Sequence, residues 1–430
     1  MLIEFRVSNH RSIREEQVLT MTAASGRGED NDLRPRDVGL SEKILPVAAI
    51  YGANASGKSN VLSALAFLRD AVVYSQRMWA PGEIIPREPF AWQQKRDEPS
   101  VYEVTFLQDD VKYEFGIACT DEAIVEEWLY AWPHGKKQTW YERDEQKFKF
   151  GPNLVGANKL IEEATRPDGL FLSTAVQLQH PQLRSVYDWF WRMDSMINQS
   201  TRHTRGRVTN RETHLANLIQ SQTQARQRTL FEVDDHRHFD LDRLQELIQS
   251  ADVGIVDFRV AIQSDQDRNS QRSTRIQLRH QSTSGDAWLP LEEESRGTRT
   301  LLNLAVPILD AIDHGSVLLV DELEASLHPK IAESIVRQFN DPETNPNNAQ
   351  LIFTTHDTNL LGTTLGDPVV RRDEVWLTEK DDEGGTVLYP LTDFTPRKEE
   401  NLERGYLQGR YSAVPFLGNF SIAPEVPSHE

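Results

Sequence analysis

Short apolar runs alternate with helical patterns in two stretches of the chain. Residues 46–51 form an apolar run that a glycine follows directly, and apolar residues at helical spacing come after it. Near the other end, apolar runs at residues 317–320 and 351–355 flank a helical pattern over residues 329–339, and a further helix is predicted at about residues 298–312. Alternation of strands and helices predicts a parallel sheet with helices on its faces.

A period of two marks the residues from about 101 to 141, between these two stretches. Residues 101–107 and 112–117 alternate apolar and polar side chains on either side of an Asp-Asp turn, and the pattern continues over residues 124–132 and 138–141. The opening residues 2–7 also have the pattern of a strand. We therefore predict an antiparallel β layer in addition to the parallel sheet.

Helical patterns with long polar stretches fill most of residues 155–250, and strand patterns return at residues 253–260 and 275–278. The fold class predicted from these patterns is α/β. We divide it into an N-terminal lobe with the β layer (residues 1–154), a helical insertion (residues 155–250) and a C-terminal lobe (residues 251–430).

Composition narrows the class of protein. About a quarter of the 430 residues are charged (26%), and no apolar run reaches the roughly eighteen residues that a membrane span needs. The N-terminus lacks the basic and apolar regions of a signal peptide. Cys119 is the only cysteine, which excludes a disulfide framework and a cysteine-based zinc site. We expect a cytoplasmic protein with no membrane partner.

The acidic balance restricts how the chain could contact nucleic acid. A net charge of -19 argues against attraction over the whole surface, so any contact must be local. The candidate is the stretch from Arg202 to Arg228, where six arginines are offset by Glu212 alone. The alternative interpretation of this stretch is a solvated helix pair with its loop.

The glycine-rich turn after residues 46–51 carries the clearest chemistry. Residues 52–59 read Gly-Ala-Asn-Ala-Ser-Gly-Lys-Ser, the pattern of a P-loop. Its glycines let backbone N–H groups approach phosphate oxygens, its lysine meets the β and γ charges, and its hydroxyl meets Mg²⁺. We predict ATP contacts from the residues of this loop and the start of the next helix: Asn54, Gly57, Lys58, Ser59 and Asn60.

Two carboxylates follow the apolar run at residues 317–320. Asp321 is predicted to hold Mg²⁺ together with Ser59, and Glu322 is predicted to be the general base that polarises the attacking water. An acidic pair after a strand can also be a simple helix cap. The presence of a P-loop in the same chain favours the catalytic interpretation.

Residues 321–329 resemble the Walker B motif and D-loop of ABC-type ATPases, and residues 353–357 resemble their H-loop. The resemblance implies a P-loop ABC ATPase head in which His356 contacts the γ-phosphate. It also implies a Q-loop glutamine, for which Gln177 and Gln179 are the candidates.

The signature motif of these ATPases packs against the ATP of the opposite subunit, and residues 294–298 resemble it. Ser295 and Gly297 match the motif and begin a predicted helix, whereas Arg296 stands where a glycine is usual and Thr298 where glutamine or glutamate is usual. The resemblance implies a head-to-tail dimer, in which each ATP lies between the P-loop of one subunit and Ser295 and Gly297 of the other.

The long interval between the P-loop and Ser295 resembles the layout of the RecF, SMC and OLD branch, as do the opening residues 2–13. The chain is most similar to stand-alone bacterial ATPases of anti-phage defence loci, of the PARIS and Rlo types. Residues 403–416 resemble the C-terminal segment of those ATPases, although Gly405 and Gly409 could instead shape a surface turn.

The resemblance implies an ATP-hydrolysing sensor and scaffold that controls a separate effector nuclease, for example of the Toprim type, in response to nucleic acid or a phage protein. A Toprim nuclease needs a glutamate and an Asp-x-Asp pair, each at the end of a strand, and the residues after His356 do not contain them. The chain is therefore not expected to be a nuclease itself. The alternative is a DNA-repair or DNA-clamping ATPase of the RecF and SMC kind that uses the arginine stretch. A free-standing phosphotransferase would need neither the signature nor the H-loop.

Overall fold

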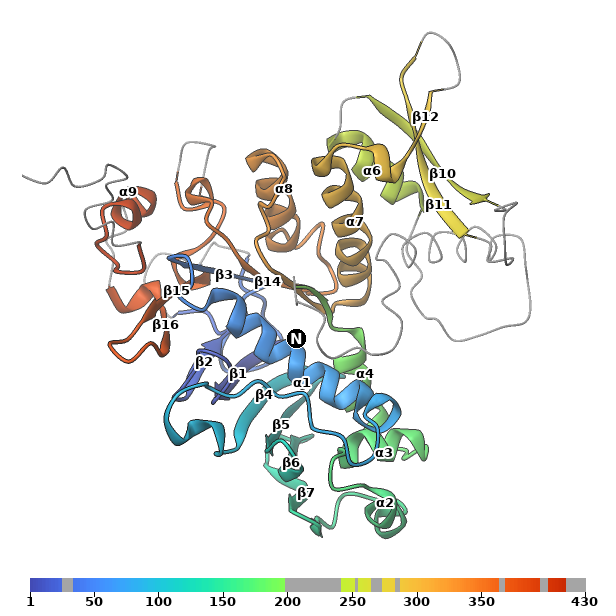
Figure 1. Cartoon of the computed structure of the whole chain (residues 1–430), viewed down its shortest axis with the longest axis vertical. Helices are drawn as coiled ribbons and strands as arrows, with labels where there is room; N and C mark the ends of the chain where they lie inside the picture. The colour runs from blue at the N-terminus through green and yellow to red at the C-terminus, as the bar shows by residue number, and fades with distance from the viewer. Residues whose placement is uncertain are drawn as a thin grey trace, which may run out of the picture.

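A six-stranded sheet forms the centre of the structure, a computed structural model that describes residues 1–24, 34–197, 241–251, 254–263, 273–282, 287–362, 368–394 and 401–414 (Figure 1). The strand order is β16-β15-β3-β14-β13-β9, and only the edge strand β16 is antiparallel to its neighbour. The strands are β3 (Val47–Gly52), β9 (Asp194–Met196), β13 (Val317–Val320), β14 (Gln350–Thr354), β15 (Val375–Lys380) and β16 (Thr386–Pro390). The parallel sheet predicted from the apolar runs is confirmed.

Helices cover both faces of this sheet, which explains why its central strands are apolar throughout. Alternate residues of β3 point in opposite directions: Ala48 and Ile50 pack with α1 (Lys58–Met78), whereas Val47 and Ala49 pack with the helices of the other face. That face carries α7 (Arg296–His314) and α8 (Pro329–Asn340). Every residue of β3, β13 and β14 is buried as a result.

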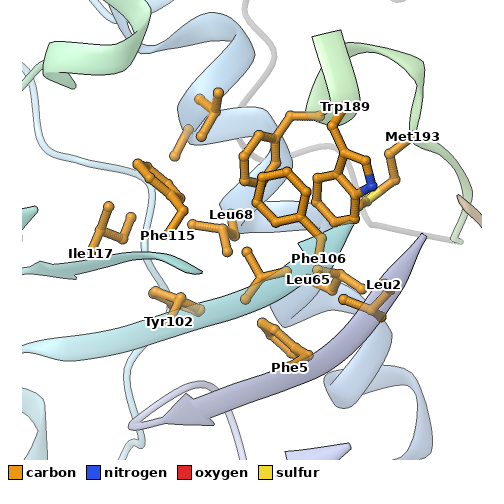
Figure 2. Close-up of a cluster of buried hydrophobic side chains, with 14 of the residues drawn as sticks. Leu2, Phe5, Leu65, Leu68, Tyr102, Phe106, Phe115, Ile117, Trp189 and Met193 are labelled. Atoms are coloured by element: carbon orange, nitrogen blue, oxygen red, sulfur yellow. The ribbon is translucent and has the colours of Figure 1, made fainter. Parts of the chain in front are cut away.

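A second, antiparallel sheet of seven strands lies on the far side of α1, in the order β2-β1-β4-β5-β6-β7-β8. Its members are β1 (Leu2–Ser8), β2 (Gln17–Thr20), β4 (Ser100–Gln108), β5 (Val111–Cys119), β6 (Ile124–Trp132), β7 (Gln138–Asp144) and β8 (Lys147–Phe150). Figure 2 shows Leu65 and Leu68 of α1 against Phe106, Phe115 and other aromatic side chains of this layer. The predicted β layer is confirmed, and the first two strands belong to it.

Three helices after this sheet, α2 (Asn158–Ala164), α3 (Phe171–Gln177) and α4 (Leu183–Arg192), share its core with α1. Trp189 of α4 stacks on Phe106 with ring centroids 4.1 Å apart. The helical character predicted for residues 155–250 is confirmed at these helices and at α6 (Leu241–Ala251), whereas no sequence pattern indicated the short strand β9. The arginine stretch at residues 202–228 lies outside the described residues, and the division into three domains stays a prediction.

A smaller three-stranded sheet packs on α6 and α7 through Leu244, Ile276, Leu278 and Leu302. It consists of β10 (Ile255–Gln263), β11 (Ser273–His280) and β12 (Trp288–Pro290), and it leads directly into α7. The remaining elements among the described residues are α9 (Leu402–Leu407) and five short 3₁₀ helices: η1 (Gln93–Arg96), η2 (Leu291–Glu293), η3 (Thr358–Leu360), η4 (Arg372–Glu374) and η5 (Leu391–Phe394). Within the parts of the chain that the structure describes, no helix is both long and apolar enough to cross a bilayer.

A buried histidine ties α1 to the antiparallel sheet. His10 is 3% exposed, and its ring nitrogens lie 2.9 Å from the Tyr102 hydroxyl and 2.9 Å from Ser63 Oγ. Because the Ser63 hydroxyl itself donates to Asn60 O, it accepts from His10 Nε2, and the neutral imidazole satisfies all three groups. Burial, assisted by the charge of Arg11, lowers the pKa of His10 to about 3.

We predict that His10 makes the stability of the protein dependent on pH. Its pKa is about 3 when folded, against an ordinary value of 6.5. Its contribution is therefore complete above pH 6.5 and is lost as the pH falls toward 3, at up to ~1.4 kcal/mol per pH unit. His10→Gln should melt below the wild type at pH 7.5, and the difference in melting temperature should shrink by pH 5. A difference that stays constant over this range would contradict the prediction.

Candidate functional site

The P-loop connects β3 to α1 by a turn that only glycine fits at its last position. Gly57 has φ 112°, and a Cβ there would overlap the side chain of Thr386. At the start of the loop, a Cβ on Gly52 would lie 2.6 Å from Ser56 Oγ. Ala55 adopts φ 63°, the left-handed conformation. The backbone therefore curls tightly in front of the first turn of α1, as the sequence predicted.

The side chain of Lys58 folds back over this loop. Its Nζ donates to Gly52 O at 3.0 Å and to Ala53 O at 3.1 Å, and the residue is 6% exposed. Burial lowers the pKa of the Lys58 ammonium, and the carboxylates of Glu322 and Asp321 oppose that shift. The structure thus places a buried cation between the loop and the acidic residues that follow β13.

Asp321 is hydrogen-bonded both to the first turn of α1 and to the end of β14. Its Oδ1 accepts a hydrogen bond from Ser59 Oγ at 2.7 Å and another from Thr354 Oγ1 at 2.7 Å. Parallel pairing of β13 with β14, in which Val320 lies opposite Phe353, brings Thr354 to this position. The predicted neighbourhood of Ser59 and Asp321 is therefore present in the structure.

Thr354 was missed by the sequence analysis. Besides its bond to Asp321, its Oγ1 accepts from the backbone N–H of Glu322 at 2.7 Å. The available signal was a hydroxyl at the carboxyl end of a strand adjacent to the one that carries Asp321, since such ends meet at one edge of a parallel sheet. Thr354 orients both carboxylate residues.

Glu322 and His356 are exposed at the same edge of the sheet. Glu322 adopts φ 53°, an uncommon conformation for a non-glycine residue that turns the chain sharply away from β13. The backbone N–H of His356 donates to Glu324 Oε1 at 2.6 Å. Although His356 is exposed, partial desolvation by its neighbours and the charge of Lys58 lower the pKa of its imidazole, which is therefore mostly neutral at pH 7.

Ser295 and Gly297 lie at the N-terminus of α7. Ser295 caps the helix by accepting from Thr298 N at 3.1 Å, and its side chain is exposed. Gly297 lies against the D-loop, where a Cβ would come within 2.9 Å of Ser326 O. The contacts described for these two residues are with Thr298, Arg299 and Ser326, and none of them is with the P-loop of the same chain.

The two asparagines of the predicted site have different surroundings. Asn54 is exposed at the tip of the P-loop. Asn60 donates to Ser12 Oγ at 2.6 Å, and that hydroxyl lies 2.7 Å from Thr386 Oγ1, which donates to Ser56 O at 2.8 Å. The opening loop of the chain, whose residues resemble a loop near the nucleotide, and the β15–β16 hairpin thus both pack behind the P-loop. The sequence gives no indication of the contact with the hairpin.

Gln177 lies far from these residues. It ends α3, and its amide oxygen, when turned toward Arg77, accepts from Arg77 Nη2 at 3.2 Å. Arg77 and Lys58 stand at opposite ends of α1, about 28 Å apart at 1.5 Å per residue. Gln179 follows just after α3, so the structure brings neither glutamine to the P-loop. We do not assign Gln177 to the nucleotide site.

The oxygen atoms of Ser59 and Asp321 can be compared with what Mg²⁺ requires. Among the residues that the structure describes, no group of three or more His, Cys, Asp and Glu side chains is placed to hold a metal ion. Mg²⁺ is instead commonly held by one or two protein oxygens together with waters and substrate phosphates. The Ser59 hydroxyl and the Asp321 carboxylate, 2.7 Å apart, fit that mode.

Comparison with known proteins supplies a family. Residues 47–362 match the family described as "AAA domain, putative AbiEii toxin, Type IV TA system", and a search of curated proteins found no match. Solved structures similar to the chain include an SMC head bound to the C-winged helix domain of ScpA, with 13% identity, coverage of 90% of this chain and 97% of that chain, and a TM-score of 0.45.

Two further solved structures are similar at the same level. One is an SMC head domain from Thermotoga maritima, with 13% identity, coverage of 90% and 98%, and a TM-score of 0.39. The other is an SMC head domain with an extended coiled coil, bound to the C-terminal domain of ScpA derived from Pyrococcus furiosus, with 12% identity, coverage of 95% and 98%, and a TM-score of 0.41.

Proposed function

Because the chain belongs to the family of AAA domains described as "AAA domain, putative AbiEii toxin, Type IV TA system", we propose that it binds and hydrolyses ATP. The observation that carries the proposal is the hydrogen bond of 2.7 Å from Ser59 Oγ to Asp321 Oδ1. It joins the hydroxyl that follows the P-loop lysine to the carboxylate that follows a buried strand. These are the two protein groups that Mg²⁺ bound to a nucleoside triphosphate requires.

Each residue of the site has a distinct role in this proposal. The backbone N–H groups of the P-loop and the Lys58 ammonium bind the β- and γ-phosphates, and Asn54 and Asn60 flank them. Ser59 and Asp321 hold Mg²⁺, which neutralises charge on the phosphate oxygens. Exposed Glu322 orients and deprotonates the attacking water, and the neutral imidazole of His356 donates a hydrogen bond toward the γ-phosphate.

A second copy of the chain would complete this site. Ser295 is exposed at a helix N-terminus, where the backbone N–H groups favour an anion, yet its described hydrogen bonds are with Thr298 and Arg299 and not with the P-loop. In a head-to-tail dimer, Ser295 and Gly297 of one copy reach the γ-phosphate held by Lys58 of the other. ATP binding then closes the dimer, and hydrolysis opens it.

The nucleotide state of such a dimer can control a partner. The family description names a putative toxin of a toxin–antitoxin system, and the motifs resemble those of anti-phage defence ATPases. We propose that the chain is a sensor and scaffold that holds a separate effector nuclease and releases or activates it when a phage component or nucleic acid changes the nucleotide state.

Glu322→Gln tests the proposed chemistry. It removes the general base and keeps the size of the side chain, so we expect ATP turnover to fall by about 100-fold or more while the ATP Kd changes by less than about threefold. Phosphate release and equilibrium binding measure the two quantities. Glu324→Gln is the matched control, because its amide oxygen can still accept from His356 N–H, and it should keep most of the turnover. Normal turnover in Glu322→Gln would contradict the assignment.

Purification from the native host tests the proposed partner. We expect a nuclease to co-purify with the tagged protein before infection, and the nuclease activity of the bound fraction to change after phage infection. Lys58→Ala, which removes the phosphate-binding cation, should abolish that change. Recovery of replication or repair proteins with no nuclease, before and after infection, would favour the DNA-clamping alternative.

A further inference from the structure

The C-terminal segment at residues 401–414 packs beside the P-loop and beside the loop that carries His356, which we call the His356 loop. Tyr406, Tyr411 and Ala413 are buried in the same apolar cluster as Tyr51, the residue before the P-loop. Helix α9 lies beside η3, which directly follows His356 and Asp357. This segment is therefore part of the core behind the site and not a surface turn.

Tyr406 connects the segment to the start of the P-loop. Its ring meets the ring of Tyr51 edge-on, with centroids 5.6 Å apart. Its hydroxyl donates a hydrogen bond to Ala413 O at 3.3 Å. Burial raises the pKa of Tyr406, so the hydroxyl keeps the proton that it donates to Ala413 O.

Two hydrogen bonds then reach the loop of His356. The Tyr51 hydroxyl donates to the backbone carbonyl of Asp357 at 3.0 Å, and Tyr51 is fully buried. Thr358 Oγ1 donates to Glu403 Oε1 of α9 at 3.3 Å. The two residues after His356 are thus fixed from behind, one by the strand that feeds the P-loop and the other by the C-terminal helix.

The glycine of α9 is required by this packing. A Cβ on Gly405 would lie 2.8 Å from Cε2 of the Tyr411 ring. Tyr411 is 1% exposed, so its ring has no free space to move into. The close approach of α9 to Tyr411 keeps Tyr406 and Glu403 at their positions beside Tyr51 and Thr358.

We infer that Tyr51, Tyr406 and Glu403 are positioning residues that fix the His356 loop relative to the P-loop. The inference rests on the proposed ATPase activity. The side of the loop that faces the site is held by the hydrogen bond from the His356 backbone to Glu324. The opposite side is held by Tyr51 and Glu403, so these contacts also determine where the loop lies relative to Lys58. A displacement of about 1 Å at a reacting group can cost up to about 100-fold in rate, whereas binding of the phosphates by the P-loop does not need this loop.

Tyr51→Phe removes the hydrogen bond to Asp357 and keeps the ring. We expect kcat for ATP to fall by about tenfold or more, with KM within about twofold of the wild type. Tyr389→Phe is the matched control: its hydroxyl donates to Tyr411 O at 3.2 Å in the same C-terminal segment, and no hydrogen bond described for it reaches Tyr51 or the His356 loop. That variant should keep its kcat. Equal losses in the two variants, or wild-type kcat in Tyr51→Phe, would overturn the inference.

A second pair of variants keeps the test decisive if Tyr51→Phe does not fold. Thr358→Val removes the donor to Glu403 at nearly constant volume and should lower kcat in the same way, whereas Thr358→Ser keeps the hydroxyl and should restore it. Equal kcat in these two variants would overturn the role of Glu403. A wild-type protein that binds ATP and does not turn it over contradicts the proposed function itself, whereas normal turnover in every variant contradicts only the positioning role.

Discussion

One carboxylate oxygen joins parts of the chain that are far apart in sequence. Asp321 Oδ1 accepts from Ser59 on α1 and from Thr354 on β14, each at 2.7 Å. These bonds form only when β3, β14 and β13 pair in parallel at the correct register, because a shift by one residue would move the side chain to the other face of the sheet. The pairing of the apolar strands therefore positions the polar side chains at their carboxyl ends. The fold and the site depend on the same register of β3, β14 and β13.

The same constraint bears on our proposal that two copies of the chain share each ATP site. The P-loop, Asp321 and His356 all follow strands of the central sheet, so one register brings them together. Ser295 instead precedes α7 and is held by the three-stranded sheet, through the contact of Glu294 with His280 at 2.6 Å. No strand pairing directs it to the P-loop of its own chain, which leaves an exposed helix N-terminus available to a second copy.

The parts of this structure that follow from local pattern could be predicted from the sequence. The apolar runs predicted β3 and β13, and the alternation of apolar and polar residues predicted the antiparallel layer. The position of Asp321 after a buried strand predicted that it lies beside Ser59. The contacts that depend on distant segments could not be predicted. Thr386 carries no local signal, and the strand-end position of Thr354 becomes informative only once β14 is known to pair beside β13. The three-residue strand β9 is too short for a periodicity. Gln177 failed as a candidate because its distance from the P-loop depends on how α3 packs along α1.

The central claim is that two copies of the chain share each ATP site, and mixing two inactive variants tests it most directly. Lys58→Ala disables the P-loop, and Ser295→Arg blocks the opposite surface, so each variant alone should be inactive. In an equimolar mixture, half of the dimers would combine the two variants and regain one intact site of two. The account predicts that ATP turnover recovers to about a quarter of the wild-type rate. A mixture as inactive as its components, or a Ser295→Arg protein with normal turnover, would contradict it.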